Sequence, residues 1–390
     1  MGINKYGTAI PGRSSLFLNY LVFNDLAILE HGTQGHMVFN FGQYFQSTLK
    51  RRMEGVYNTS AGEMDLVLGV DDRLYEAAEE AVEDGYKNLL LMPSALADVM
   101  GFDLEYYSSD ISSINSINCF TAKINGDADF YEGEEAFYNS LIKLLGKNSY
   151  DISNSFSIIG DTNSFINSKK HKEIRRLIES TFNMETSFDS LELQGLASIE
   201  KLKQAKITIV TTKSALGLAK YLMEEYEIPY YYFNSLDIGS INNDLANIAN
   251  LLNVDNYNPL KDEYYDGVAF QFKNIVDYFD DKKIILYLNV DNLIEASKLL
   301  DSLDIKYEAI VSHKHDGYSY MSIDEVIDKF NSDEYFVIGN DIITKYIKAS
   351  VAIEYIRLEY SILTPIEVPF TLLGGAYKLM KLISDRIFNE

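Results

Sequence analysis

Apolar and polar residues along the chain form two recurring patterns. Short apolar runs bounded by turn-forming residues are typical of buried strands, and longer segments with apolar residues three or four positions apart are typical of amphipathic helices. The two patterns alternate, with predicted strands at 26–29, 62–71, 87–92, 117–124, 155–160, 205–212, 282–289, 307–312 and 335–339. The segments between them include predicted helices at 72–82, 132–145, 170–180, 215–227, 241–252 and 291–303. Strands that alternate with helices favour parallel α/β sheets.

This alternation restarts twice, which divides the chain into three units. The segment 147–154 is polar and turn-prone, and another polar segment, 253–266, precedes a predicted helix at 268–279. A chain of 390 residues is long enough for two or three domains. We therefore predict an α/β fold of three Rossmann-like doubly wound parallel-sheet domains, at 1–150, 151–275 and 276–390. The third domain would end in a helix at 374–388, and the serine-rich segment 108–118 would be a loop of the first.

The acidic charge of the chain narrows its partners. It carries 34 basic and 58 acidic residues, a net charge of −24. Phosphate backbones and anionic lipid surfaces repel such a polyanion, so we expect no nucleic acid and no membrane as partners. No apolar run is long enough to span a bilayer. The one basic cluster, Lys169–Arg176, is interpreted as an exposed helix face, with a docking role as the alternative.

Cysteine usage restricts the chemistry of the chain. Its single cysteine, Cys119, allows no intrachain disulfide and no all-cysteine metal site built from this chain alone. No positively charged apolar leader opens the sequence, so we expect a cytoplasmic protein. Cys119 lies in an apolar predicted strand, which favours a buried small side chain over a nucleophile. Tyr230–Tyr232 are interpreted as packing residues, with a pocket wall as the alternative.

A glycine turn joins the first predicted strand to a helix predicted to run to about residue 53. Its sequence is His31-Gly-Thr-Gln-Gly-His36. Glycines at a strand-to-helix turn let the backbone approach a ligand closely, and the N-terminus of the helix favours an anion. Two of the five histidines of the chain, His31 and His36, bracket this turn. The alternative is a tight turn in which His31 caps or packs.

The turn and several later motifs resemble those of one protein family. After His31-Gly-Thr-Gln-Gly35 come Glu63-Met-Asp-Leu-Val-Leu-Gly69 and Ala95-Leu-Ala-Asp-Val-Met-Gly-Phe-Asp103. The motifs that follow in order are Ser157-Ile-Ile-Gly160, Ile228-Pro-Tyr230 with Asp237-Ile-Gly239, and Gly374-Gly-Ala376. In this order the motifs resemble those of the nitrogenase component 1 family, which includes nitrogenase molybdenum–iron subunits, their cofactor-assembly paralogues and tetrapyrrole reductases. The resemblance covers nearly the whole chain and implies three units around a central cleft.

The resemblance also implies a cofactor site. Family members hold an iron–sulfur cluster across a subunit interface with three cysteines of each subunit. In this chain the second cysteine position falls on His36, the third on Ala95 and the first near Ser14 or Ser15. The implied cofactor-binding residues are therefore His31, Gly32, Gln34, Gly35 and Ala95, with His36 as a metal ligand. Because serine and alanine do not replace thiolates, we expect no self-contained iron–sulfur cluster, which leaves a cluster shared with a partner or a metal held through His36.

A second candidate metal site lies in the third unit. His313 and His315 are two positions apart at the end of a predicted strand, so they would share one face of it. The carboxyl end of a parallel sheet is where α/β proteins bind ligands. A plain polar loop is the alternative to metal ligation.

Two functions follow from the resemblance. The first is a subunit of a nitrogenase-like oxidoreductase, a cysteine-depleted partner of a cluster-bearing homologue that receives electrons from an ATP-dependent iron–sulfur reductase. The alternative is a non-catalytic paralogue that binds a small molecule, a tetrapyrrole or a cofactor precursor in the interdomain cleft. Loss of the cysteines favours the alternative, and the retained glycine turn favours the first. Both expect a homo- or heterodimer, and neither identifies catalytic residues or a substrate.

Overall fold

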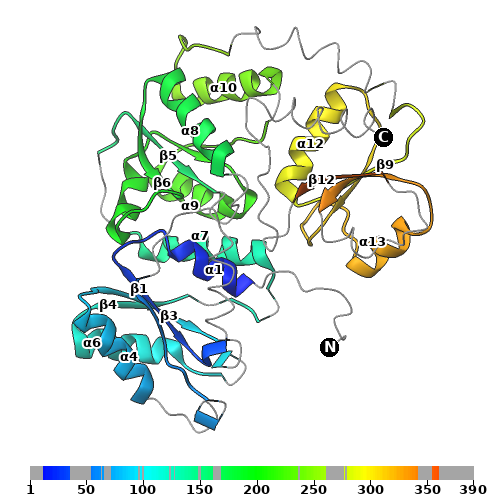
Figure 1. The fold of residues 1–390 in the computed structure, drawn as a ribbon. Coiled ribbons are helices and arrows are strands. Elements are labelled where there is room, and N and C mark those ends of the chain that lie inside the picture. Colours follow the sequence, from blue (N-terminus) through cyan, green and yellow to red (C-terminus); the bar gives the residue numbers. More distant parts are fainter. Residues whose placement is uncertain are drawn as a thin grey trace.

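Three parallel sheets of four strands each organise the chain (Figure 1). The computed structural model describes residues 12–35, 54–62, 64–65, 72–94, 97–98, 101–122, 124–126, 128–147, 151–160, 168–235, 238–260, 276, 279–340 and 354–359. The first sheet contains β1 (Leu26–His31), β2 (Val56–Asn58), β3 (Asn88–Pro93) and β4 (Asn118–Thr121). The second contains β5 (Ser155–Ile159), β6 (Glu185–Asp189), β7 (Ile207–Val210) and β8 (Tyr230–Tyr232). The third contains β9 (Ile284–Leu288), β10 (Glu308–Val311), β11 (Phe336–Asn340) and β12 (Glu354–Glu359).

The three sheets repeat one strand order. The orders are β2-β1-β3-β4, β6-β5-β7-β8 and β10-β9-β11-β12, and neighbouring strands in each sheet are parallel. This is the doubly wound arrangement, so the predicted α/β fold of Rossmann-like sheets is confirmed. In such a sheet the chain winds in opposite directions from the first and third strands, and a crevice opens beside their carboxyl ends. The carboxyl ends of β1/β3, β5/β7 and β9/β11 are therefore the three positions that the strand order marks for such a crevice.

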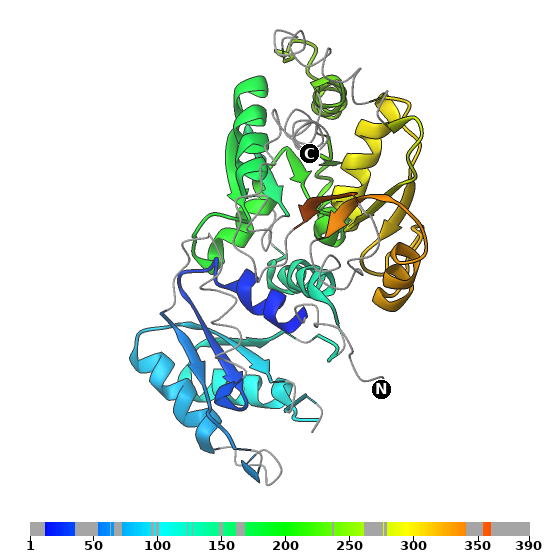
Figure 2. The same ribbon diagram turned by 45° about the vertical axis from the view of Figure 1, so that its right-hand side comes forward.

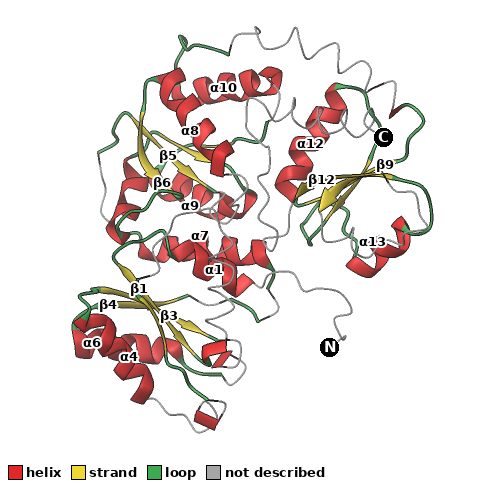
Figure 3. Cartoon of the chain, viewed as in Figure 1, coloured by secondary structure: helices red, strands yellow, loops and turns green. Residues whose placement is uncertain are grey.

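Helices cover both faces of the sheets (Figure 3). The first unit has α1 (Gly12–Tyr20), α4 (Asp72–Glu83), α6 (Leu104–Asn115) and α7 (Phe130–Leu144). The second has α8 (Ser168–Phe182), α9 (Leu216–Tyr226), α10 (Ile238–Leu252) and two 3-10 helices, η1 (Leu196–Gln204) and η2 (Lys213–Ala215). The third has α12 (Val290–Ser302) and α13 (Ile323–Phe330). No described helix is long and apolar enough to cross a membrane.

Alternation along the strands sends successive side chains to opposite faces. In β1, Ala27 and Leu29 pack in the core under α4 and α6, whereas Leu26 and Ile28 pack in the core that contains α1 and α7. This second core continues into the second unit through residues of β5, β7 and α9. The first and second units therefore share one core, with α1 and α7 between their sheets, whereas the third unit has cores of its own (Figure 2).

One local prediction is wrong, and a second falls mostly on residues that the structure does not describe. The segment 108–118 is mostly the helix α6 rather than a loop, because Asp103 caps its start and serine hydroxyls bond back to helix carbonyls, as Ser113 Oγ does to Ser109 O at 2.9 Å. The strand predicted at 62–71 lies mostly outside the described residues, of which 64–65 are helical and Gly62 N donates to Asp65 Oδ2. The strand that pairs with β1 there is instead β2, which the sequence patterns did not single out.

Two predicted helices fall outside the described residues, the one that follows the glycine turn and the one at 374–388. The helix predicted at 268–279 also lies largely outside them. The domain limits at 150 and 275 stay predictions.

Candidate functional site

The glycine turn lies at the β1/β3 crevice. β1 ends at His31, and Gly32 follows beside Ser94, the residue after β3. The two chains are so close that a Cβ added to Gly32 would lie 2.1 Å from Ser94 Oγ and 2.2 Å from Ser94 Cβ. Only glycine therefore fits at this position without a shift of its neighbour, Ser94 of the same chain, and a close approach to a ligand stays a prediction.

Backbone hydrogen bonds fix this turn on both sides. Ser94 N donates to His31 O at 2.9 Å, and Gly32 N donates to Thr59 Oγ1 at 3.0 Å. The His31 side chain is 2% exposed, its Nδ1 lies 3.3 Å from Thr59 Oγ1, and its ring centroid lies 4.1 Å from that of Phe102. His31 thus packs as a wall of the crevice, and a role in cofactor binding stays a prediction.

A buried charged cluster lies next to the turn. Arg13, from the first turn of α1, is 8% exposed, and its Nη2 lies 3.2 Å from Asp98 Oδ2. Arg13 Nε has no hydrogen-bond partner among the described residues. Glu30, the residue of β1 before His31, is 3% exposed and accepts a hydrogen bond from Asn58 Nδ2 at 3.1 Å.

Burial perturbs the acid–base behaviour of this cluster. It raises the pKa of Glu30 to about 7, against the opposing effects of the Asn58 hydrogen bond and the Arg13 charge. Burial also lowers the pKa of Arg13, although the Asp98 and Glu30 charges oppose that shift. A carboxyl whose pKa is raised and a guanidinium whose Nε has no partner among the described residues are therefore the perturbed polar groups beside the turn.

The other residues implied as cofactor ligands or contacts differ in exposure, and two of them lie outside the described residues. Gln34 and Gly35 are exposed, with open space around the Cβ position of Gly35. Ser14 and Ser15 are buried in α1. His36 and Ala95 lie outside the described residues, so their roles stay predictions.

The described side chains of the crevice do not fit an iron–sulfur cluster. Thr59, Ser94, Arg13 and Asp98 offer hydroxyls, a guanidinium and a carboxylate, whereas such clusters require thiolates. The single thiol of the chain, Cys119, lies on β4, which β3 separates from β1, and burial raises its pKa to about 12. Among the described residues no group of three histidine, cysteine or acidic side chains is arranged to hold a metal ion.

The two third-unit histidines lie in the turn after β10. The expectation that they share a strand face is wrong, because β10 ends at Val311. The ring of His313 stacks on that of Tyr131 of α7, with centroids 4.0 Å apart, while His315 packs edge-on against Tyr318. Burial and the nearby His315 lower the pKa of His313 to about 4, and His313 Nδ1 has no hydrogen-bond partner among the described residues. A neutral imidazole therefore lies where the third unit contacts α7, and its metal role stays a prediction.

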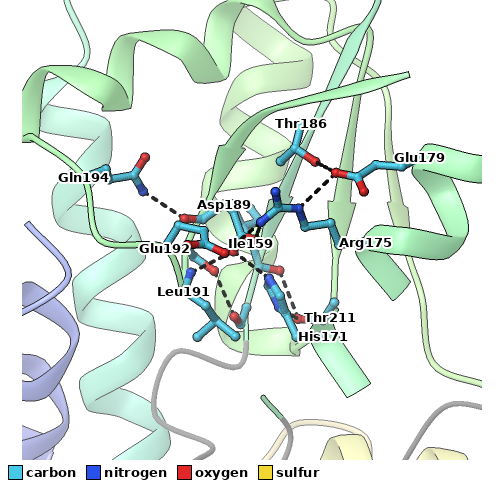
Figure 4. A network of polar contacts seen from close by, with 12 residues as sticks. Ile159, His171, Arg175, Glu179, Thr186, Asp189, Leu191, Glu192, Gln194 and Thr211 are labelled. Carbon is cyan, nitrogen blue, oxygen red and sulfur yellow. Dashed lines mark hydrogen bonds and ion pairs between the residues drawn. The ribbon is translucent and has the colours of Figure 1, made fainter. Parts of the chain in front are cut away.

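The basic cluster of the second unit is only partly the exposed helix face that the sequence predicts, since Lys172 and Arg176 are exposed and two other members are buried. Within α8, Lys170 is 2% exposed and His171 is fully buried. His171 Nε2 lies 2.8 Å from Asp189 Oδ1, and Arg175 Nη1 lies 2.9 Å from Asp189 Oδ2 (Figure 4). His171 Nδ1 lies 3.5 Å from Thr211 Oγ1, so the network joins the carboxyl ends of β6 and β7 to α8.

This network determines the ionisation of its central acid. Burial alone would raise the pKa of Asp189, but the His171 charge and hydrogen bond, the Leu191 N–H and the Arg175 charge outweigh it and lower the pKa to about 2. Sequence reasoning missed these residues because the strand partner, Asp189, is distant in sequence. The one available signal was a histidine inside a basic run of an amphipathic helix.

Three doubly wound units of one strand order, with a close-packed glycine turn at the first crevice, define the class of fold. Two solved structures share it. One titled "Nitrogenase Cp1 at pH 6.5" has a TM-score of 0.73 and 15% identity, and the match covers 100% of this chain and 94% of that chain. One titled "Nitrogenase Cp1 at pH 5" has a TM-score of 0.72 and 13% identity over 100% of this chain and 90% of that chain. No curated protein matches the chain.

The sequence identifies the family more directly than these distant structures do. The model of the family "Nitrogenase component 1 type Oxidoreductase" matches residues 17–349. The chain belongs to this family.

Proposed function

We propose that the chain is a cysteine-depleted subunit of a nitrogenase-like oxidoreductase that pairs through its first unit with a homologous, cluster-bearing chain. The contrast between backbone and side chains at the β1/β3 crevice carries this proposal. Gly32 keeps its close packing on Ser94, whereas the charged groups beside the turn are Arg13, Glu30 and Asp98 rather than thiolates. The close packing at Gly32 without ligand chemistry supports a role for this turn as part of the surface on which, by resemblance to the family, two subunits meet.

In this proposal the cluster ligands come from the partner. A homologue with cysteines at its own turn would hold the cluster, and His36 would face it from this chain as a single imidazole ligand or hydrogen-bond donor. Electrons would reach the cluster from an ATP-dependent iron–sulfur reductase. The chain itself would supply the fold on its side of the interface and no redox group.

Co-expression tests the proposal. The chain is purified anaerobically alone and together with the homologue encoded beside its gene, and iron, acid-labile sulfide and sedimentation are measured on each sample. We expect a colourless chain on its own and an iron-containing complex with the homologue. A brown chain with about four irons on its own, or a strict monomer in both samples, would overturn the proposal.

A second candidate function is supported by His313. A buried neutral imidazole with an unused nitrogen accepts a hydrogen bond from a ligand that enters between the third unit and α7, beside the Tyr131 ring. The chain would then be a non-catalytic paralogue that binds a small molecule such as a tetrapyrrole. Titration with a water-soluble porphyrin, followed by its absorbance shift, tests this candidate. Saturable binding that His313→Phe abolishes supports it, and the absence of saturable binding to the parent chain contradicts it.

A further inference from the structure

A buried charge from the second unit meets an opposite charge from the third. Lys170, in the first turn of α8, forms an ion pair with Glu295 of α12, and the two side chains are 3% and 4% exposed. The helix α12 lies on the side of the third unit that faces the second (Figure 1). Both charges have therefore left water at the contact between two units.

A second set of contacts lies one turn earlier on α12. Asp291, 8% exposed, accepts hydrogen bonds from the backbone N–H of Lys213, at 2.9 Å, and from the hydroxyl of Tyr232. Lys213 Nζ donates to Tyr318 OH at 3.0 Å and lies 4.5 Å from the centroid of that ring. A third lysine comes from the third unit and contacts the second. Lys298 of α12 donates to Asn234, the second residue after β8.

The buried polar groups of this contact have partners only while the two units are together. A buried charge without a partner costs several kcal/mol, whereas a buried charge with an opposite charge and hydrogen bonds is tolerated. If the units separated before water reached the contact, Lys170 would lose its ion pair with Glu295. Asp291 would lose its two hydrogen-bond donors. Water must therefore enter the whole contact before it opens, which makes the opening cooperative.

The contacts between the second and third units lie beside the carboxyl ends of their strands. Lys213 begins η2, directly after the carboxyl end of β7, and Asp291 lies in the first turn of α12, directly after β9. The contacts thus join the β5/β7 crevice of the second unit to the β9/β11 crevice of the third. These are the places where a doubly wound sheet otherwise receives a ligand.

We propose that the pairs Lys170–Glu295, Lys213–Asp291 and Lys298–Asn234 form a clasp that closes the second and third units on each other without any ligand. Within the clasp the carboxylate of Glu295 pairs with the ammonium of Lys170. The carboxyl of Asp291 accepts from the backbone N–H of Lys213 beside the β5/β7 crevice, and Lys298 donates to Asn234. The clasp is thus an autoinhibitory contact, and access to the space between these units requires that it opens. This inference is independent of the pairing through the first unit, since the clasp contains no residue of that unit.

Interspin distances test the closure in the full chain. Spin labels are placed at the exposed positions Glu224→Cys in α9 and Asp328→Cys in α13, in a Cys119→Ser background. We expect one narrow distance distribution for the otherwise unchanged chain, and a shift to longer and broader distances when Lys170→Met is added. The matched control is Lys283→Met, which removes an exposed ion pair with Asp333 inside the third unit and should leave the distribution unchanged. A broad distribution before any substitution, or no shift with Lys170→Met, overturns the proposal.

A double-mutant cycle provides a second readout if the single variants lose stability. Lys170→Met and Glu295→Met are near-isosteric, and removal of both partners leaves no unpaired buried charge. We expect each single variant to lower the urea midpoint and the double variant to recover most of that loss. Additive losses would mean that the two side chains do not meet in solution, which contradicts the clasp.

Discussion

Arg13 Nη2 lies 3.2 Å from Asp98 Oδ2, which ties the first turn of α1 to the segment that follows β3. The arginine side chain is 9% exposed and the aspartate 35%, so the cation is the more deeply buried partner. Glu30, on β1, adds the charge of a second carboxyl near the same cation. The polar groups beside the glycine turn therefore pair in part with one another, although Arg13 Nε has no partner among the described residues.

Glu30 should make stability depend on pH. Its ordinary pKa of about 4.5 is raised to about 7 in the folded chain, so the folded state binds more protons than the unfolded state between these values. The free energy of unfolding should therefore fall as pH rises from about 4.5 to 7. Glu30→Gln removes this dependence and should stabilise the chain relative to the parent at pH 8 by at most about 3 kcal/mol, with little difference at pH 4. Urea unfolding at both pH values measures it.

The exposed variant Glu224→Gln is the control for this experiment. It should leave the pH profile of the parent unchanged. If Glu30→Gln shows the same pH profile as that control, burial does not raise the pKa of Glu30 in the folded chain, which contradicts the account of the charged cluster.

Gly32→Ala should destabilise the chain by about 1–3 kcal/mol, because the new Cβ meets Ser94 in a packed region. Gly35→Ala is the matched control, since its Cβ meets nothing within 4 Å. Adding Ser94→Gly to Gly32→Ala removes the two atoms that clash and should recover part of the loss. Thermal unfolding of the four proteins measures the effect, and equal melting temperatures for Gly32→Ala and Gly35→Ala would contradict the close approach at the crevice.

Asp189→Asn should be among the most destabilising conservative changes in the second unit. It removes the carboxylate that holds His171 and Arg175, and loss of one partner from a buried ion pair costs about 3–5 kcal/mol. The pKa of Asp189 is lowered to about 2, so its contribution is present above its ordinary value near 4 and is lost as pH falls through about 2. The stability gap between parent and variant should therefore narrow between pH 4 and pH 2. Asp333→Asn, which breaks an exposed pair, is the control and should leave stability nearly unchanged at neutral pH.

His36→Ala tests the predicted role of the turn. If His36 contacts the cluster or the partner across the subunit interface, this variant should lose partner binding or metal with little change in melting temperature. Affinity for the homologue and iron content of the complex are measured beside the thermal unfolding curve. An unchanged affinity and iron content, or an effect confined to stability, would make His36 a structural residue and favour the non-catalytic alternative.

Much of the fold could be predicted from hydrophobic spacing, because buried strands such as β5 and amphipathic helices such as α4 carry strong local patterns. The helix α6 was missed because serines disfavour helices by competing for backbone hydrogen bonds, and here those bonds are made within the helix itself. The strand β2 was missed because it has only three residues and depends on its neighbour β1. Pairing between strands is non-local information that a local pattern does not contain.

The part of the candidate site that depends on local backbone conformation could be predicted from the sequence, and the side-chain cluster could not. The glycine turn follows from Gly32 and its position after a strand, whereas the cluster beside it combines Arg13, Glu30 and Asp98 from three separate segments. Lys170 and His171 were read as an exposed basic face because burial of a charge depends on partners, Glu295 and Asp189, that tertiary structure brings to them. Charged residues in a sequence do not reveal which of them find such partners.

Native mass spectrometry under anaerobic conditions tests the central claim most directly, since it measures subunit composition and cluster mass in one spectrum. The chain should carry no cluster mass alone and should form a complex with its homologue that does. That cluster mass should disappear when the cysteines of the homologue are changed to serine, and it should persist when this chain carries Cys119→Ser. Cluster mass on the chain alone, or no complex with the homologue, would contradict a cysteine-depleted subunit.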